Sequence, residues 1–177
     1  AAEKNAKVII TVDCGITADQ AAIKAKELGI DLIITDHHQD ILEKMPDAFA
    51  IVNPNRRDSP HHYYKNLAGV GVAFALAVRI KKIYEEETKQ ILPSLYPLLS
   101  FVAVGTIADL APLDHMNLKL VRHGLKTLLN TPYIGLSAFL EDDDRKNPKG
   151  IDGEKISFKI APMINSKGRL DHPEAAL

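Results

Sequence analysis

Two short β-branched segments, each ending in an acidic residue, constrain the fold of this chain more than any other feature of its sequence. The first is VIITVD at residues 8–13, and the second is LIITD at residues 32–36. Between them lies a helical pattern, with Thr17 and Gln20 at the spacing of a capping box and Gly29 at a common helix stop. Strand, helix and strand at this length form a βαβ unit, which predicts two parallel strands. Their continuous apolar runs predict strands that are covered on both faces.

The two strand ends bring four polar side chains to one edge of the predicted sheet. Asp13 follows the first strand, and Asp36, His37 and His38 follow the second. Parallel strands have their carboxyl ends at the same edge, and ligands of open α/β sheets bind outside that edge. Taken singly, an acid at a strand end is commonly a cap, and a His-His pair can be a polar loop. Their joint appearance predicts a functional site.

The rest of the chain indicates one more strand and then helices, so the predicted fold class is α/β, a parallel sheet followed by a helical region. The expected elements are a helical turn over residues 40–45, a third strand at 49–52, a long helix from near Gly71 with Phe74, Ala77, Ile80 and Tyr84 buried, a helix over 98–109, a helix capped by Asp114, a short helix opened by Pro132, a charged loop at 141–150 and a helical segment from 156.

Asp109 continues the apolar face of the helix that is predicted over residues 98–109. A bare carboxylate is costly to bury. Either the helix has ended before Asp109 and the carboxylate is exposed to water, or a cation or strong hydrogen bonds hold it.

Carboxylates and imidazoles at one sheet edge favour a metal site. Mixed ligation of this kind suits Mn²⁺, Fe²⁺ or Zn²⁺, whereas Mg²⁺ prefers oxygen alone. If Asp109 joins them, three carboxylates and two imidazoles can begin a two-metal site with ions about 4 Å apart. Such a pair lowers the pKa of a bridging water, clamps phosphoryl oxygens and stabilises the leaving oxygen. Thiolate ligation is not expected, because Cys14 is the only cysteine.

Contacts with phosphate must be local, because 22 basic and 23 acidic residues nearly cancel and leave no global basic field. Arg56, in a polar loop, can meet phosphate or only water. Asn165 and Arg169 lie at i and i+4 on a predicted helix, and a planar guanidinium suits bidentate contact with phosphate. The single cysteine excludes an internal disulfide framework and predicts a reducing, cytoplasmic setting. No apolar run approaches the length of a membrane span.

Three motifs of the chain resemble motifs of the DHH phosphoesterase superfamily. They are VDCGIT at residues 12–17, TDHH at 35–38 and GTIAD at 105–109. Three further stretches resemble the single-stranded-DNA-specific exonucleases of that superfamily, and these are VNPN at 52–55, LAGVGVAF at 67–74 and PMINSKGRL at 162–170. The DHH tripeptide alone is a weak signal, but the ordered set is specific.

The resemblance implies a 5′-to-3′ exonuclease that hydrolyses single-stranded DNA in recombination and repair, with Mn²⁺ or Mg²⁺ as cofactor and two ions in the intact protein. It implies that Asp13, His37 and Asp109 are metal ligands. It makes His38 a stabiliser of the transition state or a proton donor to the leaving oxygen. Asp36 becomes either a ligand or a second contact that orients the histidines.

The resemblance also implies a domain organisation and partners. Residues 1–150 are expected to form a DHH domain that lacks the strand with the first motif, and residues 151–177 to begin a connecting helix towards an absent DHH-associated domain. Asn165 and Arg169 would contact DNA phosphate from this helix. The expected partners are single-stranded DNA, a helicase and a single-strand-binding protein, with no membrane. Because ligands on the missing parts are absent, the chain alone is expected to be inactive or nearly so.

Two other functions remain as alternatives. One is a DHH phosphoesterase that acts on short oligonucleotides or nucleotide bisphosphates, which a comparison of long strands with di- to pentanucleotides would distinguish. The other is a non-catalytic replication scaffold with a DHH fold. A scaffold is expected to have lost ligands, whereas the acids and histidines of all three motifs are present.

Overall fold

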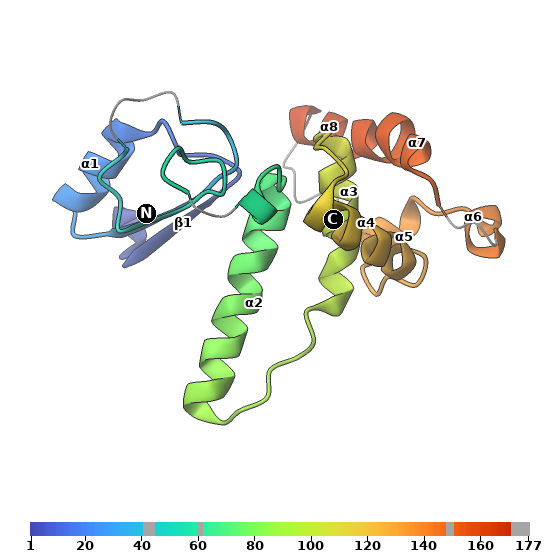
Figure 1. Ribbon diagram of the computed structural model, residues 1–177, viewed down its shortest axis with the longest axis horizontal. Helices are drawn as coiled ribbons and strands as arrows, with labels where there is room; N and C mark the ends of the chain where they lie inside the picture. The colour runs from blue at the N-terminus through green and yellow to red at the C-terminus, as the bar shows by residue number, and fades with distance from the viewer. Residues whose placement is uncertain (41–44, 60–61, 148–150, 171–177) are drawn as a thin grey trace. The chain divides into compact units, whose positions relative to one another are not determined.

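The structure is a computed structural model that describes residues 1–40, 45–59, 62–147 and 151–170 (Figure 1). The chain divides into two compact units, residues 1–77 and 78–177. The first unit carries a sheet and the second is helical. The predicted boundary at residue 150 falls inside the second unit; it concerns the domains of a longer protein and stays a prediction.

The first unit contains the βαβ motif that the sequence predicts. Its elements are the 3₁₀ turn η1 (Ala2–Lys4), strand β1 (Val8–Val12), helix α1 (Asp19–Glu27), strands β2 (Asp31–Thr35) and β3 (Ala50–Val52), the 3₁₀ turn η2 (His62–Tyr64) and the first part of helix α2 (Gly69–Thr88). The helical turn predicted over residues 40–45 lies largely outside the described residues.

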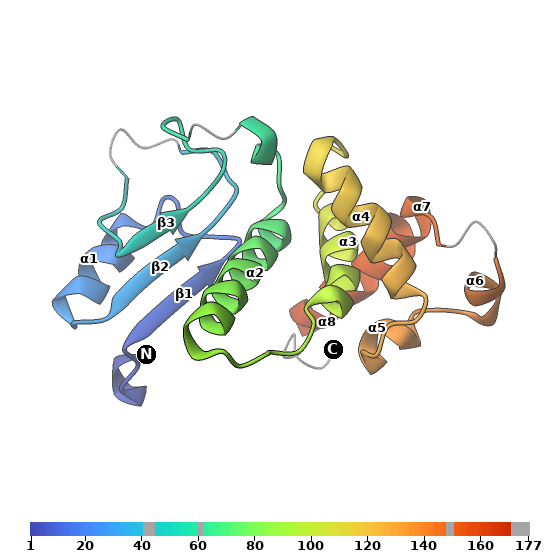
Figure 2. The same ribbon diagram turned by 60° about the horizontal axis from the view of Figure 1, so that its bottom comes forward.

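The strands of the described residues form one parallel sheet in the order β1-β2-β3 (Figure 2). Val12 pairs with Thr35, and Thr35 pairs with Val52, so the three strands end at one level. The ladder continues by one bond at each strand end, because the Asp13 amide donates to the Thr35 carbonyl at 2.9 Å and the Asp36 amide donates to the Val52 carbonyl at 3.1 Å. This register places Asp13 and Asp36 at one edge of the sheet, which confirms the prediction.

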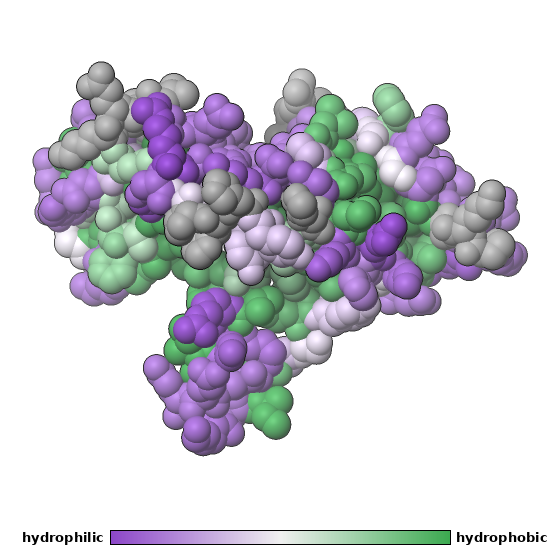
Figure 3. Space-filling view, viewed as in Figure 1, coloured by the Kyte–Doolittle hydropathy of each residue, from purple (hydrophilic) through white to green (hydrophobic). Residues whose placement is uncertain are grey.

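The two faces of the sheet are covered to different degrees within the described part of the first unit. Helix α1 packs on the face that carries Leu32 and Ile34, which are 5% and 0% exposed. On β1 the opposite face holds Val8, Ile10 and Val12, each about half exposed at 49%, 48% and 54%. Figure 3 shows hydrophobic surface over this unit. The expectation of cover on both faces is therefore wrong for β1, because successive strand residues alternate faces and the helix meets only one of them.

The start of α1 differs from its prediction. Ala18 is the N-cap, and no side chain caps this end of the helix, so the capping box at Thr17 is wrong. Residues 13–17 instead form a tight turn, in which Asp13 and Gly15 have φ values of 63° and 116°. This turn points the Ile16 amide back at the sheet edge, where it donates to Asp36. The stop at Gly29 is confirmed by its φ of 65°.

The second unit is helical, as predicted. Its elements are the end of α2, the 3₁₀ turn η3 (Tyr96–Leu98), helices α3 (Leu99–Ala108), α4 (His115–Leu128), α5 (Ile134–Ala138), α6 (Asp142–Lys146) and α7 (Gly153–Lys155), the π-helical turn η4 (Ile156–Ile160) and helix α8 (Ala161–Leu170). They enclose a core that includes Val104, Ile107, Val121, Leu128, Ile156 and Ile160.

Two expectations for helical segments are wrong. Residues 141–150 contain helix α6 rather than a loop throughout, because Glu141 and Asp144 form a reciprocal capping box. On α2, Ile80 and Tyr84 are 51% and 40% exposed rather than buried. Within the described residues, no helix is both long and apolar enough to cross a bilayer.

Candidate metal centre

Asp13 and His37 meet at the carboxyl edge of the sheet. The Asp13 Oδ1 atom lies 3.1 Å from the His37 Nε2 atom, with the Asp13 side chain 53% exposed and the His37 side chain 15% exposed. One ligand atom each from Asp13, His37 and His38 can be chosen so that all lie within 4.8 Å of one another. Three side chains from two neighbouring strand ends therefore converge as the sequence predicts.

The close approach of Asp13 depends on two unusual backbone positions. Asp13 itself has a left-handed φ of 63°, which few non-glycine residues adopt and which is often found at functional sites. Gly69, the first residue of α2, lies directly against it. A Cβ atom at Gly69 would be 2.0 Å from Asp13 Oδ1, so no larger residue fits there without displacing the carboxylate. The helix start thus forms one wall of the site.

The pair of side chains passes a simple geometric test for a shared cation. Two ligand atoms on adjacent corners of an octahedron with bonds of about 2.1 Å lie about 3 Å apart. The 3.1 Å separation of Asp13 Oδ1 and His37 Nε2 matches that edge. A carboxylate with an imidazole also fits the ligand preferences of Mn²⁺. The residues present therefore fit the metal that the sequence implies.

Asp36 has a different environment from Asp13. It is 1% exposed, and its Oδ2 atom accepts from the Ile16 amide at 2.9 Å. Its Oδ1 atom accepts from the amides of His37 and His38 and from the His38 ring, at 2.8, 3.2 and 2.7 Å. Burial on its own raises the pKa of this carboxyl, but the hydrogen bonds from Ile16, His38 and His37 outweigh it, so the pKa lies below its ordinary value. Of the two roles left open for Asp36, this geometry favours orienting the histidines.

His38 is oriented by that contact. Its Nδ1 atom lies 2.7 Å from Asp36 Oδ1, and its side chain is 61% exposed. The rings of His37 and His38 have centroids 4.5 Å apart and are inclined by 58°. A carboxylate at Nδ1 fixes the ring and its tautomer, so a proton passed to a substrate would come from Nε2.

Residues that support the histidine loop were not given roles from the sequence. Asn53 and Asn55, in the segment after β3, donate hydrogen bonds to the backbone carbonyls of His38 and His37. Their VNPN motif is marked by its resemblance to the exonucleases. Polar side chains that bond to a loop backbone leave no periodic signal in a sequence, and only the asparagine-proline turn signal marks the segment.

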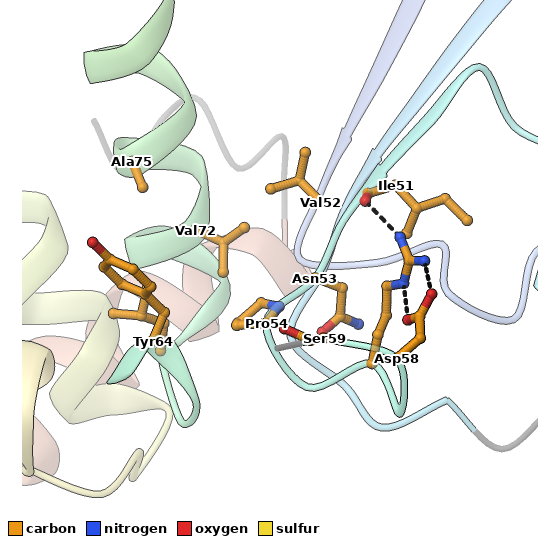
Figure 4. Close-up of a pocket in the computed structure, with 11 residues that line it drawn as sticks. Ile51, Val52, Asn53, Pro54, Asp58, Ser59, Tyr64, Val72 and Ala75 are labelled. Carbon is orange, nitrogen blue, oxygen red and sulfur yellow. Dashed lines mark hydrogen bonds and ion pairs between the residues drawn. The ribbon is translucent and has the colours of Figure 1, made fainter. Parts of the chain in front are cut away.

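Arg56 is engaged within the first unit. Its Nε atom donates to Asp58 at 2.8 Å, its NH2 group pairs with the same carboxylate, and its NH1 group donates to the Ile51 carbonyl at 3.1 Å. Beside this pair is a mainly apolar pocket of about 420 Å³, which Tyr64, Val72 and Asn53 help to line (Figure 4). A phosphate at Arg56 would have to compete with Asp58.

The remaining predicted site residues belong to the second unit. Asp109 is the C-cap of α3 and is exposed, which agrees with the first of the two alternatives considered for it. Asn165, on α8, is exposed and lines a pocket of about 460 Å³ together with Gly105 and Ala108 at the end of α3. Arg169 lies on the same helix, and its side chain lies outside what the structure describes.

The sheet, the Asp-His-His edge and the sequence motifs together define a class of protein. The chain belongs to the DHH family, because the profile of the "DHH family, N-terminal domain" matches residues 2–106.

Within this family the chain is similar to single-stranded-DNA-specific exonucleases called RecJ. The RecJ of Salmonella typhimurium is 40% identical over 174 residues, which are 95% of this chain and 30% of that protein. The RecJ of Bacillus subtilis is 38% identical over 99% of this chain and 21% of that protein. A crystal structure of exonuclease RecJ bound to manganese matches with a TM-score of 0.77 and 31% identity, over 99% of this chain and 42% of that one.

The comparisons confirm the predicted family and the α/β fold. RecJ structures have been solved with Mn²⁺ and with Mg²⁺, the two cofactors that the sequence predicts. The chain spans about 30% of the length of several of the curated relatives that it matches.

Proposed function

We propose that this chain supplies part of the catalytic centre of a metal-dependent, 5′-to-3′ exonuclease that hydrolyses phosphodiester bonds of single-stranded DNA. The observation that carries the proposal is the 3.1 Å approach of Asp13 Oδ1 to His37 Nε2, with His38 beside them at the same sheet edge. The named activity of the RecJ relatives supports the choice of single-stranded DNA.

Each residue of the centre has a distinct task in this proposal. Asp13 and His37 hold the cation, which in such enzymes activates water and neutralises phosphoryl charge. Asp36 accepts from the His38 ring and sets its tautomer. His38 then contacts the scissile phosphate or donates a proton to the leaving oxygen.

We also propose that Asp109 is a metal ligand, as its motif in the family implies. A carboxylate at the C-cap of a helix faces the negative end of the helix dipole, which is unfavourable by about 0.3–1 kcal/mol. Asp109 occupies such a position at the end of α3. A nearby cation would offset that cost.

For the DNA, we propose phosphate contacts by Asn165 and Arg169, and a weaker one by Arg56. Asn165 is exposed on α8, as a DNA contact requires. Arg56 would first have to exchange Asp58 for phosphate. A helicase and a single-strand-binding protein are the proposed partners, since an enzyme restricted to single strands needs a source of unwound DNA. The exposed thiol of Cys14 supports a reducing, cytoplasmic location.

The test transfers this chain into a relative of known activity. Residues 1–177 replace the matching segment of the Escherichia coli RecJ, which is 37% identical. The hybrid is expected to release label from a 5′-labelled single strand with Mn²⁺. A His38→Ala hybrid is expected to be at least 100-fold slower, because its contact with the scissile phosphate or its general acid catalysis is lost.

Controls separate this function from its alternatives. A blunt duplex should be spared, and long single strands should be degraded in preference to di- to pentanucleotides. A folded hybrid that binds Mn²⁺ but releases no label would contradict the proposal, and so would a preference for the short oligonucleotides. The isolated 177-residue chain is expected to show little or no nuclease activity, and robust activity that Asp13→Ala abolishes would overturn that expectation.

A further inference from the structure

Asn55 bonds to two other segments of the first unit and to Asn53 in its own loop. Its side-chain Nδ2 donates to the His37 carbonyl at 2.5 Å, and its Oδ1 accepts from the Asn66 amide at 3.3 Å. Its backbone amide donates to Asn53 Oδ1 at 2.8 Å, and Asn53 Nδ2 in turn donates to the His38 carbonyl at 2.8 Å. The loop after β3 therefore clasps the backbone of both histidines.

Asn66, the other partner of Asn55, lies in the turn before Gly69, which packs against Asp13. Asn66 has a left-handed φ of 70° and precedes the start of α2 by three residues. At that start lies Gly69, whose missing side chain leaves the space that the Asp13 carboxylate occupies. The side-chain amide of Asn55 thus contacts both the backbone of His37 and the turn at Asn66 that precedes Gly69.

The chemistry of the amide allows this arrangement in only one orientation. The His37 carbonyl can only accept, and the Asn66 amide can only donate, so the NH₂ group of Asn55 must face His37 and its oxygen must face Asn66. A carboxylate cannot replace the donor, and a hydroxyl is too short to span both partners. The position requires an amide of this length.

We propose that Asn55 is a positioning residue that holds the His37 side of the cation site at the correct distance from the Asp13 side. This inference rests on the proposed metal site. Residues that orient ligands in this way commonly change metal affinity 10- to 100-fold when they are substituted. Asn55 does so from the backbone of His37, without touching the cation.

The same two loops are joined by a second contact, which provides a matched control. Arg57 pairs through Nε with Asp40 Oδ1 at 2.9 Å and donates through NH2 to the Asp40 carbonyl at 2.9 Å. This clasp connects the loops but contacts neither histidine. Arg57→Gln therefore tests whether joining the loops is sufficient, and Asn55→Ala tests the position of His37.

The experiment measures Mn²⁺ binding to the 177-residue chain by isothermal titration calorimetry at 0.15 M salt, together with the rise in melting temperature that Mn²⁺ causes. We expect the dissociation constant of Asn55→Ala to be 10- to 100-fold higher than that of the unaltered chain. Arg57→Gln should stay within twofold, and so should Asn130→Ala, an exposed change in the second unit.

Two results would overturn the inference. One is an Asn55→Ala chain that binds Mn²⁺ within twofold of the unaltered chain. The other is an Arg57→Gln chain that is weakened as much as Asn55→Ala, which would make loop stability the cause. If Asn55→Ala does not fold, Asn55→Ser is measured against the same limits. An unaltered chain that does not bind Mn²⁺ would instead refute the metal site itself and this inference with it.

Discussion

The acids that follow β1 and β2 have similar sequence surroundings and opposite environments. Asp13 is 53% exposed on a strained backbone, and its carboxylate faces an imidazole. Asp36 is 1% exposed and accepts four hydrogen bonds from Ile16, His37 and His38. The two strands are neighbours in register, so the difference comes from the turns that follow them.

This difference separates an acid that orients its neighbours from the acid that is proposed to bind the cation. The oxygens of Asp36 are already occupied by donors that also stabilise its negative charge. Asp13 keeps oxygen exposed at the price of backbone strain, which structures retain where a site requires it. The same substitution should therefore have different effects at the two positions. At Asp36 it should lower the stability of the chain, and at Asp13 it should lower the affinity for Mn²⁺.

The largest effect on stability is expected for Asp36→Asn. In the variant an NH₂ group faces donors that bond to a carboxylate oxygen in the unaltered chain. Each lost hydrogen bond to a charged group is worth about 1.5–3 kcal/mol. Because the neighbouring amides can find other partners in part, we expect the free energy of unfolding to fall by about 3 kcal/mol. Urea unfolding followed by circular dichroism measures it, and a loss below about 1 kcal/mol would remove the structural role of Asp36.

A smaller loss is expected for Gly69→Ala. The added methyl group would lie 2.0 Å from Asp13 Oδ1, so the carboxylate or the start of α2 must move. Overpacking of this kind costs about 1–3 kcal/mol, and we expect about 2 kcal/mol together with weaker Mn²⁺ binding. Gly153→Ala is the control, since a Cβ atom there meets nothing within 4 Å. Equal effects of the two changes on Mn²⁺ binding would contradict a role for Gly69 beside Asp13.

For Asp13→Asn we expect almost no change in stability. Asparagine has nearly the same shape and tolerates a left-handed backbone, so the free energy of unfolding should stay within about 0.5 kcal/mol. The affinity for Mn²⁺ should nevertheless fall at least 10-fold, because a carboxylate ligand has been lost. A stable variant with unchanged affinity would show that Asp13 is not a ligand.

The smallest effect is expected in the response of stability to acid. The pKa of Asp36 is lower in the folded chain than its unfolded value of about 3.9. In the folded chain burial raises this pKa, but the hydrogen bonds from Ile16, His38 and His37 outweigh that effect. Its contribution is therefore complete above the unfolded pKa and is lost as the pH falls through the lower folded pKa. Unfolding measured between pH 2 and 6 should show this loss, and in Asp36→Asn the decline should be shallower. An unaltered decline in the variant would refute the assignment.

Much of the fold could be predicted from the sequence, because the period and length of apolar segments determine strands and helices locally. The parallel pairing of β1 and β2 and the ends of α3, to within one residue, follow from such patterns. The uncovered face of β1 could not be predicted, since an apolar run looks the same whether or not another layer covers it. Likewise, Thr17 is a residue type that commonly caps helices, but the tight turn that begins at Asp13 makes Ala18 the N-cap instead.

The site could be predicted in part for the same reason. Parallel strand ends bring Asp13 and His37 to one edge, but nothing local distinguishes an exposed ligand from a buried orienter such as Asp36. The roles of Asn55 and Gly69 depend on contacts between segments far apart in the chain. Resemblance to a family marks such positions without giving the physical reason for them.

X-ray anomalous scattering from crystals of the 177-residue chain grown with Mn²⁺ tests the central claim most directly. The account predicts a manganese peak that lies within about 2.5 Å of both the carboxylate of Asp13 and Nε2 of His37. Manganese bound elsewhere, or no peak at this edge at millimolar Mn²⁺, would contradict it.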